Sequence, residues 1–230
     1  MVRQLELLLL EPCCPHCLET TAAGSDSEAG GFCPGCLALL QLNGRRGVIS
    51  VASARSSSPQ PVPWWALASY ADRWRQALLQ QRQRPSTAWL EAAAAQLLRY
   101  TREALPEGSS RPVLVPMPSW KRRSNPLARG WVQALARRGG WSQRTLLRCN
   151  HRALSQHHLG AALRRQNSRN RFRVSTAQAS PVIQPVLLVD DIMTTGATVE
   201  AACGALLSQG MTVAGVLLLA RTGRGGDELS

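Results

Sequence analysis

Residues 185–202, PVLLVDDIMTTGATVEAA, contain the pattern that decides the fold. Four apolar residues precede two adjacent carboxylates, Asp190 and Asp191, and a turn rich in threonine and glycine follows them. A short, continuous apolar run is typical of a strand that is buried on both faces. The stretch therefore predicts a buried strand, a turn, and a helix over 197–209 that Gly210 ends.

Similar units lie along the rest of the chain. The apolar runs VLVPMP (113–118), TLLRC (145–149) and MTVAGVLLLA (211–220) predict further strands. Helical spacing over 64–83, stopped by Pro85, predicts one helix, and Ser86 or Thr87 can cap a second. A further helix is expected over 126–138. Continuous apolar strands that alternate with helices predict an α/β domain with a mainly parallel sheet.

The composition fits a folded, water-soluble protein. A chain of 230 residues with 44% hydrophobic residues can fill a core. No run of about 18 uncharged apolar residues occurs, so we expect no membrane span. Glu6 interrupts the short apolar run near the start, which is a poor match to a signal peptide. We therefore expect a cytoplasmic protein.

The net charge of +13 is concentrated in one part of the chain. No Asp or Glu occurs from Gly108 to Gln184, and residues 111–173 hold fifteen Lys or Arg. Such a one-sided field attracts polyanions, either nucleic acid or a polyphosphate ligand. Because all of these cations except Lys121 are Arg, a compositional bias is the alternative explanation.

Two cysteine pairs stand near the N-terminus. Cys14 and Cys17 form one CxxC, Cys33 and Cys36 form the other, and fifteen residues separate them. Two such turns supply the four thiolates that a structural zinc ion prefers. A disulfide pair is the alternative, but nothing indicates secretion. Neighbouring Cys13 and His16 are weaker candidates, so we expect a structural zinc site of four cysteines.

The turn after the acid pair has the composition of a phosphate site. Backbone N–H groups, the positive end of a helix dipole and hydroxyl groups converge there. The carboxylates would repel a phosphate, so they are expected to face vicinal hydroxyls or a divalent cation. A sugar phosphate meets both demands. The alternative is that Asp191 or Thr194 only caps the helix. The candidate phosphate-binding residues are Thr194, Thr195, Gly196, Ala197 and Thr198.

The stretch VLLVDDIMTTGAT resembles the phosphoribosyl pyrophosphate signature of type I phosphoribosyltransferases. The resemblance implies a parallel sheet flanked by helices, in which the catalytic Asp190 and Asp191 hold the ribose hydroxyls. The turn would hold the 5′-phosphate, and magnesium would accompany phosphoribosyl pyrophosphate. Such enzymes bind pyrophosphate after another strand, which indicates the backbone of residues 116–119 and the side chains of Lys121, Arg122 or Arg123.

The N-terminal cysteine pairs joined to such a domain are similar to the ComF competence family, which implies a bacterial DNA-uptake role and a small zinc-ribbon-like unit. RGWVQ (129–133) resembles a family pattern RGFNQ, and a second family set is present at Gln156, Leu159, Arg164, Asn167 and Phe172. The resemblance adds Arg129 and Arg164 as substrate-binding candidates. The chain departs from it at Val132, where Asn is usual, and in LLQQRQR (78–84), where a Leu-Lys pair is common.

Two classes of function follow. The first is a phosphoribosyltransferase of unknown acceptor. The second is a single-stranded-DNA-binding accessory protein that works with DNA-uptake proteins and has a regulatory or vestigial sugar-phosphate site. The expected organisation is a zinc-binding segment (1–55), a linker and helical region that packs on the core (56–108), a phosphoribosyltransferase-like domain (109–224) and a flexible tail (225–230).

Overall fold

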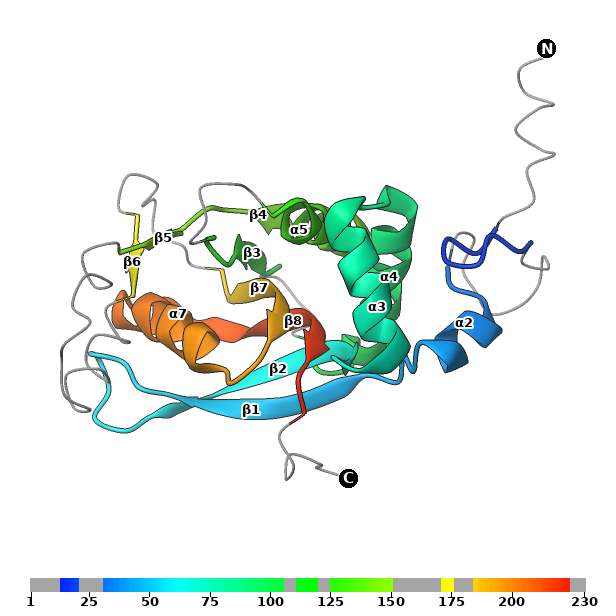
Figure 1. Cartoon of the computed structure of the whole chain (residues 1–230). Helices are drawn as coiled ribbons and strands as arrows, with labels where there is room; N and C mark the ends of the chain where they lie inside the picture. The colour runs from blue at the N-terminus through cyan, green and yellow to red at the C-terminus, as the bar shows by residue number, and fades with distance from the viewer. Residues whose placement is uncertain are drawn as a thin grey trace, which may run out of the picture.

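A six-stranded mixed sheet forms the centre of the protein (Figure 1). The computed structural model describes residues 13–20, 31–105, 111–119, 125–150, 171–175 and 184–223. The strand order is β1-β2-β8-β7-β3-β4, and only β1 and β2 are antiparallel. The strands are β1 (Arg45–Val51), β2 (Gln60–Ser69), β3 (Val113–Pro116), β4 (Ser142–Gln143), β7 (Val186–Met193) and β8 (Val213–Arg221). The predicted α/β class with a mostly parallel sheet is confirmed.

Helices cover both faces of this sheet. Helices α3 (Asp72–Gln83), α4 (Thr87–Thr101) and α5 (Pro126–Gly139) share one hydrophobic core with the sheet. Helix α7 (Ala197–Ser208) shares the other core with a two-stranded antiparallel ribbon, β5 (Leu147–Cys149) and β6 (Phe172–Val174). Within the described ranges, none of the helices is long and apolar enough to cross a membrane.

The predicted helix over 64–83 is wrong in its first part. Residues 64–69 belong to β2, and the helix begins at Asp72. Trp64 packs into the core on the α7 side of the sheet, and Trp65 packs into the core on the α3 side. A strand that is buried on both faces has no polar side to reveal its period of two, so its apolar run also fits a helix. The Ser/Pro-rich residues that follow β1 connect it to β2 in a hairpin. The division into domains stays a prediction.

The predicted cap at Ser86 is confirmed, and the structure shows two further helix-end signals at α5. The Ser86 hydroxyl accepts a hydrogen bond of 3.3 Å from the Trp89 N–H at the start of α4. At α5, the Asn125 side chain accepts one of 3.5 Å from the Ala128 N–H, and a proline follows as the first helical residue. Gly140 ends α5 in the left-handed conformation at φ 62°. The cap at Asn125 also places this residue beside the acid pair.

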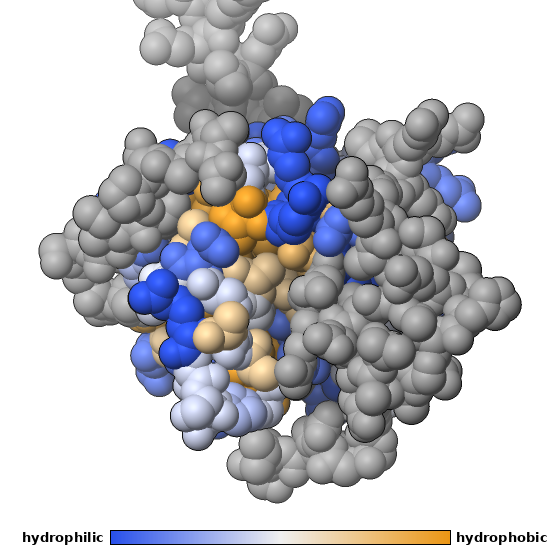
Figure 2. Space-filling model, turned by 90° about the vertical axis from the view of Figure 1, so that its left-hand side faces the viewer, coloured by the Kyte–Doolittle hydropathy of each residue, from blue (hydrophilic) through white to orange (hydrophobic). Residues whose placement is uncertain are grey.

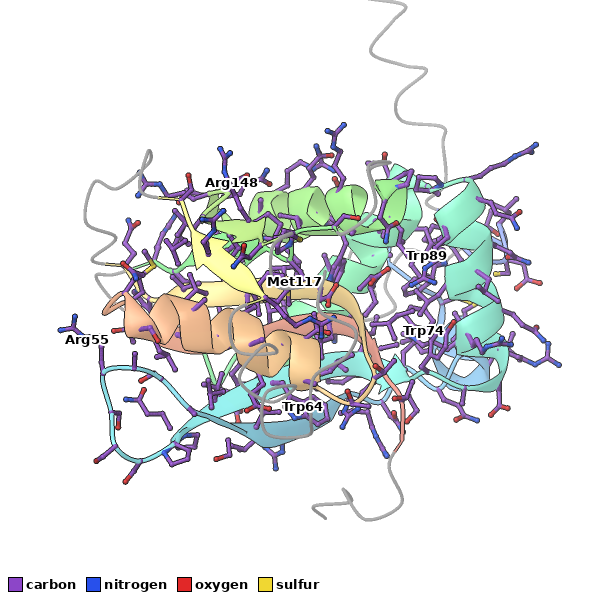
Figure 3. All side chains as sticks on the ribbon, turned by 60° about the vertical axis from the view of Figure 1, so that its left-hand side comes forward. Arg55, Trp64, Trp74, Trp89, Met117 and Arg148 are labelled. Carbon is purple, nitrogen blue, oxygen red and sulfur yellow. The ribbon has the colours of Figure 1, made fainter. Side chains whose placement is uncertain are left out.

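Aromatic contacts join the N-terminal segment to the sheet. This segment includes the short helix α2 (Pro34–Leu39), which lies beyond α3 and α4 (Figure 1). Phe32 meets Trp89 edge to face at 5.5 Å, and Trp89 stacks on Trp74 at 5.0 Å. The Trp74 indole N–H donates to the Leu219 carbonyl of β8 over 3.0 Å. Figure 3 shows Trp74 and Trp89 beside each other. The segment therefore shares its core with the rest of the protein.

Candidate functional site

The four predicted cysteines form one cluster. The Sγ atoms of Cys14, Cys17, Cys33 and Cys36 all lie within 4.8 Å of one another, and the Cys17 and Cys33 sulfurs are 3.8 Å apart. With Zn–S bonds of about 2.3 Å, the edge of a tetrahedral site measures about 3.8 Å. The cluster could therefore hold a zinc ion. Cys13 and His16 are not part of it.

The surroundings of the four sulfur atoms favour the thiolate form at Cys14. Burial works to raise the pKa of the Cys14 thiol, but backbone N–H groups of Cys17, Cys33 and His16 outweigh it, and the pKa is lowered to about 7. The pKa of Cys36 is raised, first by burial and then by the neighbouring thiols. Four thiolates this close would repel one another, so a cation is needed to bring all four into the charged form.

Asp191 is held from three directions at the end of β7. Its side chain is only 10% exposed. Its Oδ2 accepts hydrogen bonds from the Arg82 guanidinium at 3.0 Å and the Asn125 amide at 2.9 Å. Its Oδ1 accepts one from the backbone N–H of Ile192 at 2.9 Å. The carboxylate therefore ties the end of α3 and the start of α5 to the central strand.

Asp190 is only partly engaged. Its Oδ1 accepts a hydrogen bond from the Asp191 N–H at 2.9 Å. Among the described residues, its other close polar neighbour is the Asp191 side chain, whose carboxylate does not compensate its charge. Burial raises the pKa of Asp190 to about 7, the negative charge of Asp191 adds to the rise, and the positive charge of Arg82 partly offsets it. A hydroxyl donor or a cation would stabilise its charged form.

The turn after the acid pair presents its side chains to solvent. Thr194, Thr195 and Ala197 are exposed, and Gly196 is buried in the left-handed conformation at φ 82°. Gly196 occupies the N-cap position of α7, and Thr195 accepts a hydrogen bond of 3.4 Å from the Ala197 N–H. Neither Asp191 nor Thr194 is therefore the N-cap, so simple helix capping does not explain both residues.

The end of β3 lies beside the end of β7. Pro116 is in register with Val189, and the Met117 N–H donates to the Val189 carbonyl over 2.8 Å. Residues 116–119 therefore adjoin the acid pair, as expected from their position after a parallel strand. The candidates Lys121, Arg122, Arg123 and Arg164 lie outside the described residues, as do Gln156, Leu159 and Asn167.

The stretch RGWVQ contributes mainly to packing. Val132 is 4% exposed in the core under α5, which accounts for an apolar residue at a position where Asn is usual. A Cβ atom placed on Gly130 would lie 2.6 Å from the Leu90 side chain, so the glycine lets α5 approach α4. Arg129 is exposed on α5, and no contact joins it to the acid pair within the described residues. Phe172 is buried in the core on the α7 side.

Two residues at the acid pair were not among the predicted site residues. Arg82 lies in the stretch LLQQRQR, where the chain departs from the Leu-Lys pattern, and it supplies a cation from that stretch. Asn125 precedes Pro126, and this pair of residues is a helix-start signal that could have indicated its place at the head of α5. Neither signal reveals the contact with Asp191.

Comparison with known proteins shows which family the chain is related to. No family model matches the chain. The chain is 32% identical over 176 residues to the DNA utilization protein YhgH of Salmonella typhimurium strain LT2, covering 71% of this chain and 75% of that protein. The DNA utilization protein YhgH of Salmonella typhi matches with the same identity and coverage. From this similarity, the chain belongs to the family of the DNA utilization protein YhgH.

Proposed function

We propose that this protein binds phosphoribosyl pyrophosphate, with magnesium, at the carboxyl ends of its parallel strands. The observation that carries the proposal is the Asp190 carboxylate, which among the described residues accepts from one backbone N–H and from no amide or guanidinium side chain, next to an exposed hydroxyl turn at the start of α7. Ligands of open α/β sheets bind beyond this edge. The resemblance of VLLVDDIMTTGAT to the type I phosphoribosyltransferase signature, and the fold that it implies, support the assignment.

The turn is suited to the 5′-phosphate. Hydroxyl groups come from Thr194, Thr195 and Thr198. The first N–H groups of α7 lie at the positive end of the helix dipole, where they can donate hydrogen bonds to a phosphate. Gly196 allows the backbone to turn without the steric cost that a side chain would have at φ 82°. The 5′-phosphate is thus bound by hydroxyl and N–H groups, and no carboxylate, which would repel it, takes part in its binding.

The two acids have different tasks in this proposal. Asp190 accepts hydrogen bonds from the ribose hydroxyls, and it suits magnesium because carboxylate oxygens are preferred ligands of that ion. Asp191 positions Asp190 and the ends of α3 and α5 through Arg82 and Asn125. A bound magnesium ion would neutralise charge on the pyrophosphate as it leaves. The proposed pyrophosphate contacts are the backbone of residues 116–119, Lys121, Arg129 and Arg164.

We infer that the reaction class, if the bound ligand reacts, is phosphoribosyl transfer. The bond from the anomeric carbon to pyrophosphate breaks, pyrophosphate takes the electron pair, and an acceptor forms the new bond to that carbon. The four cysteines would hold a structural zinc ion, since a closed set of four thiolates leaves no open coordination position. The similarity to a DNA utilization protein and the resemblance to the ComF family support a role in DNA uptake in the cytoplasm of a bacterium.

Titration calorimetry tests the ligand. Magnesium with phosphoribosyl pyrophosphate is titrated into the native protein and into the Asp190→Asn and Thr195→Val variants. We expect binding by the native protein and a loss of at least about tenfold in affinity for each variant, because each removes one charge-assisted contact. Glu200→Gln, which changes an exposed acid in the first turn of α7, is the matched control. Absence of heat from the native protein would refute the proposal.

A second candidate function is binding of single-stranded DNA. Arg148 and Arg173 lie directly opposite each other on β5 and β6, and both are exposed. Like charges in this arrangement repel, so a polyanion would stabilise them. Figure 3 shows Arg148 at the outer surface, and in Figure 2 hydrophilic residues flank a more apolar central band of the described surface at that end of the molecule. Arg137 is already paired with Glu91 at 2.7 Å.

Fluorescence anisotropy with a labelled oligothymidylate tests this candidate. Each phosphate contact with a single strand contributes about 0.7 to the slope of log affinity against log salt. The double substitution Arg148→Gln/Arg173→Gln is expected to reduce that slope by up to about 1.4. Arg137→Gln serves as the matched control because Arg137 forms an ion pair. An unchanged slope in the double variant would remove the ribbon as a DNA surface.

A further inference from the structure

Arg221 is a buried cation at the end of β8, close to the turn of the acid pair. It is 8% exposed, although most arginine side chains remain in contact with solvent. Its Cζ lies 5.6 Å from the centre of the Trp64 ring, which fits a cation–π contact. The residue that it faces in the ladder is Met193, the last residue before the turn. Both its side chain and its backbone therefore lie next to the residue from which the turn begins.

The Met193 carbonyl is held by two donors from the end of β8. The Arg221 guanidinium donates to it through Nη1 over 3.4 Å, and the backbone N–H of Thr222 donates over 3.0 Å. The first bond is long, so by itself it would be weak. The contact with the Trp64 ring restricts the Arg221 side chain and so reduces the entropy lost in making the bond.

Trp64 in turn depends on a glycine of β1. Gly47 is directly opposite Trp64 in the hairpin. A Cβ atom placed on Gly47 would lie 2.6 Å from the Trp64 ring, so the indole can lie across β1 only because no side chain is there. Two residues along β1, the Ile49 side chain is 3.8 Å from the position that a Cβ atom of Gly196 would take. Strands β1, β2 and β8 therefore support the underside of the turn.

We propose that Arg221 is a positioning residue for the phosphate-binding turn. It fixes the Met193 carbonyl, and this fixes the direction of the N–H groups that follow in the turn. Its positive charge lies at the same end of the site and adds to the attraction for a phosphate. Trp64 and Gly47 hold the guanidinium in place. This inference rests on the proposed function, because it names the residue behind the 5′-phosphate site of that function.

The position of Arg221 predicts a selective effect on two partial ligands. Ribose 5-phosphate contains the end that the turn would bind, and magnesium pyrophosphate contains the end that would lie near residues 116–119. Calorimetry is carried out with both ligands on the native protein, Arg221→Met and Arg221→Lys. We expect Arg221→Met to bind ribose 5-phosphate about tenfold more weakly and pyrophosphate unchanged. Arg221→Lys keeps the charge but loses the planar fork, and we expect it to recover only part of the affinity.

Each result has a distinct meaning. If native protein binds ribose 5-phosphate and Arg221→Met binds it equally well, this inference is wrong and the proposed function stands. Equal weakening toward both ligands also overturns it, since that is the result of a general structural defect. If Arg221→Met fails to fold, Trp64→Phe, which keeps a smaller aromatic ring, gives the same selective comparison. If the native protein binds magnesium with phosphoribosyl pyrophosphate but not ribose 5-phosphate, this inference is wrong and the proposed function stands; absence of binding to either ligand overturns both.

Discussion

Replacing Asp190 by Asn should make the protein more stable at neutral pH and weaken its binding of the proposed ligand. In the folded protein, burial and the charge of Asp191 raise the pKa of Asp190 from its ordinary value of 3.8 to about 7. Between these two values the folded state keeps a proton that the unfolded chain has lost. The free energy of unfolding of the native protein therefore falls as the pH rises from about 4 to about 7, and it is constant above.

The size of the effect follows from this difference. At about 1.4 kcal/mol for each pH unit, the raised pKa costs about 4 kcal/mol at pH 8 and about 2 kcal/mol at pH 5. Asn has no charge to lose, so Asp190→Asn should exceed the native protein in stability by these amounts. Because Asp190 retains some exposure to solvent, the figures are upper bounds. Below pH 3 the two proteins should be equally stable.

Urea unfolding followed by tryptophan fluorescence measures the difference. The experiment is carried out at pH 5 and pH 8 in magnesium-free buffer, since a bound cation would lower the pKa of Asp190. Asp72→Asn, which removes an exposed acid in the first turn of α3, controls for overall charge. An Asp190→Asn variant that is less stable than native protein at pH 8, or that gains equally at both pH values, would refute the reasoning.

Three further outcomes are expected. Arg82→Met should lower the free energy of unfolding by about 1 kcal/mol in the same urea assay, because the Arg82 side chain is 39% exposed and solvent weakens its ion pair with Asp191. Arg82→Lys should recover part of this loss in stability. Cys17→Ser should reduce zinc content measured by mass spectrometry and lower the thermal midpoint, whereas Cys13→Ser, outside the cluster, should change neither. Gly204→Ala should cost about 1 kcal/mol net, because its Cβ would lie 2.8 Å from a backbone carbonyl of the β1–β2 connection. Gly223→Ala is its control, because among the described residues no atom lies within 4 Å of a Cβ atom at that position.

The strand, turn and helix around Asp190 could be predicted from the sequence because each has a local signal. The apolar run, the glycine with positive φ and the helical spacing all lie within one short stretch. The error at Trp64 and Trp65 has a physical cause as well. Whether such a run forms a strand depends on its pairing with β1 and β8 and on burial of its two faces in the cores on the α3 and α7 sides, and these partners lie far away in the chain.

The division of labour between the two acids could not be predicted. Asp191 is 109 residues from Arg82 and 66 residues from Asn125, so no spacing in the sequence relates them. The sequence pattern showed two neighbouring carboxylates that would face vicinal hydroxyls or a cation, and the family resemblance assigned both to the ribose. Within the described parts of the chain, Asp191 accepts three hydrogen bonds, from Arg82, Asn125 and the Ile192 N–H, whereas Asp190 accepts one from a backbone N–H.

This asymmetry is a reason to expect a ligand at Asp190 and to expect none at Asp191. A carboxylate in a largely buried place, beside a second negative charge, destabilises the folded protein unless something compensates it. Asp191 already has a guanidinium, an amide and a backbone N–H as compensation, so its charge is accounted for by the fold itself. Among the residues that the structure describes, Asp190 accepts from one backbone N–H and from no cationic or amide side chain. If no ligand bound at Asp190, a protein with an uncharged residue at this position would be more stable. Asp190→Asn would then raise stability without weakening ligand binding. A variant that gains stability and keeps full ligand binding would therefore contradict the assignment of this residue to the site.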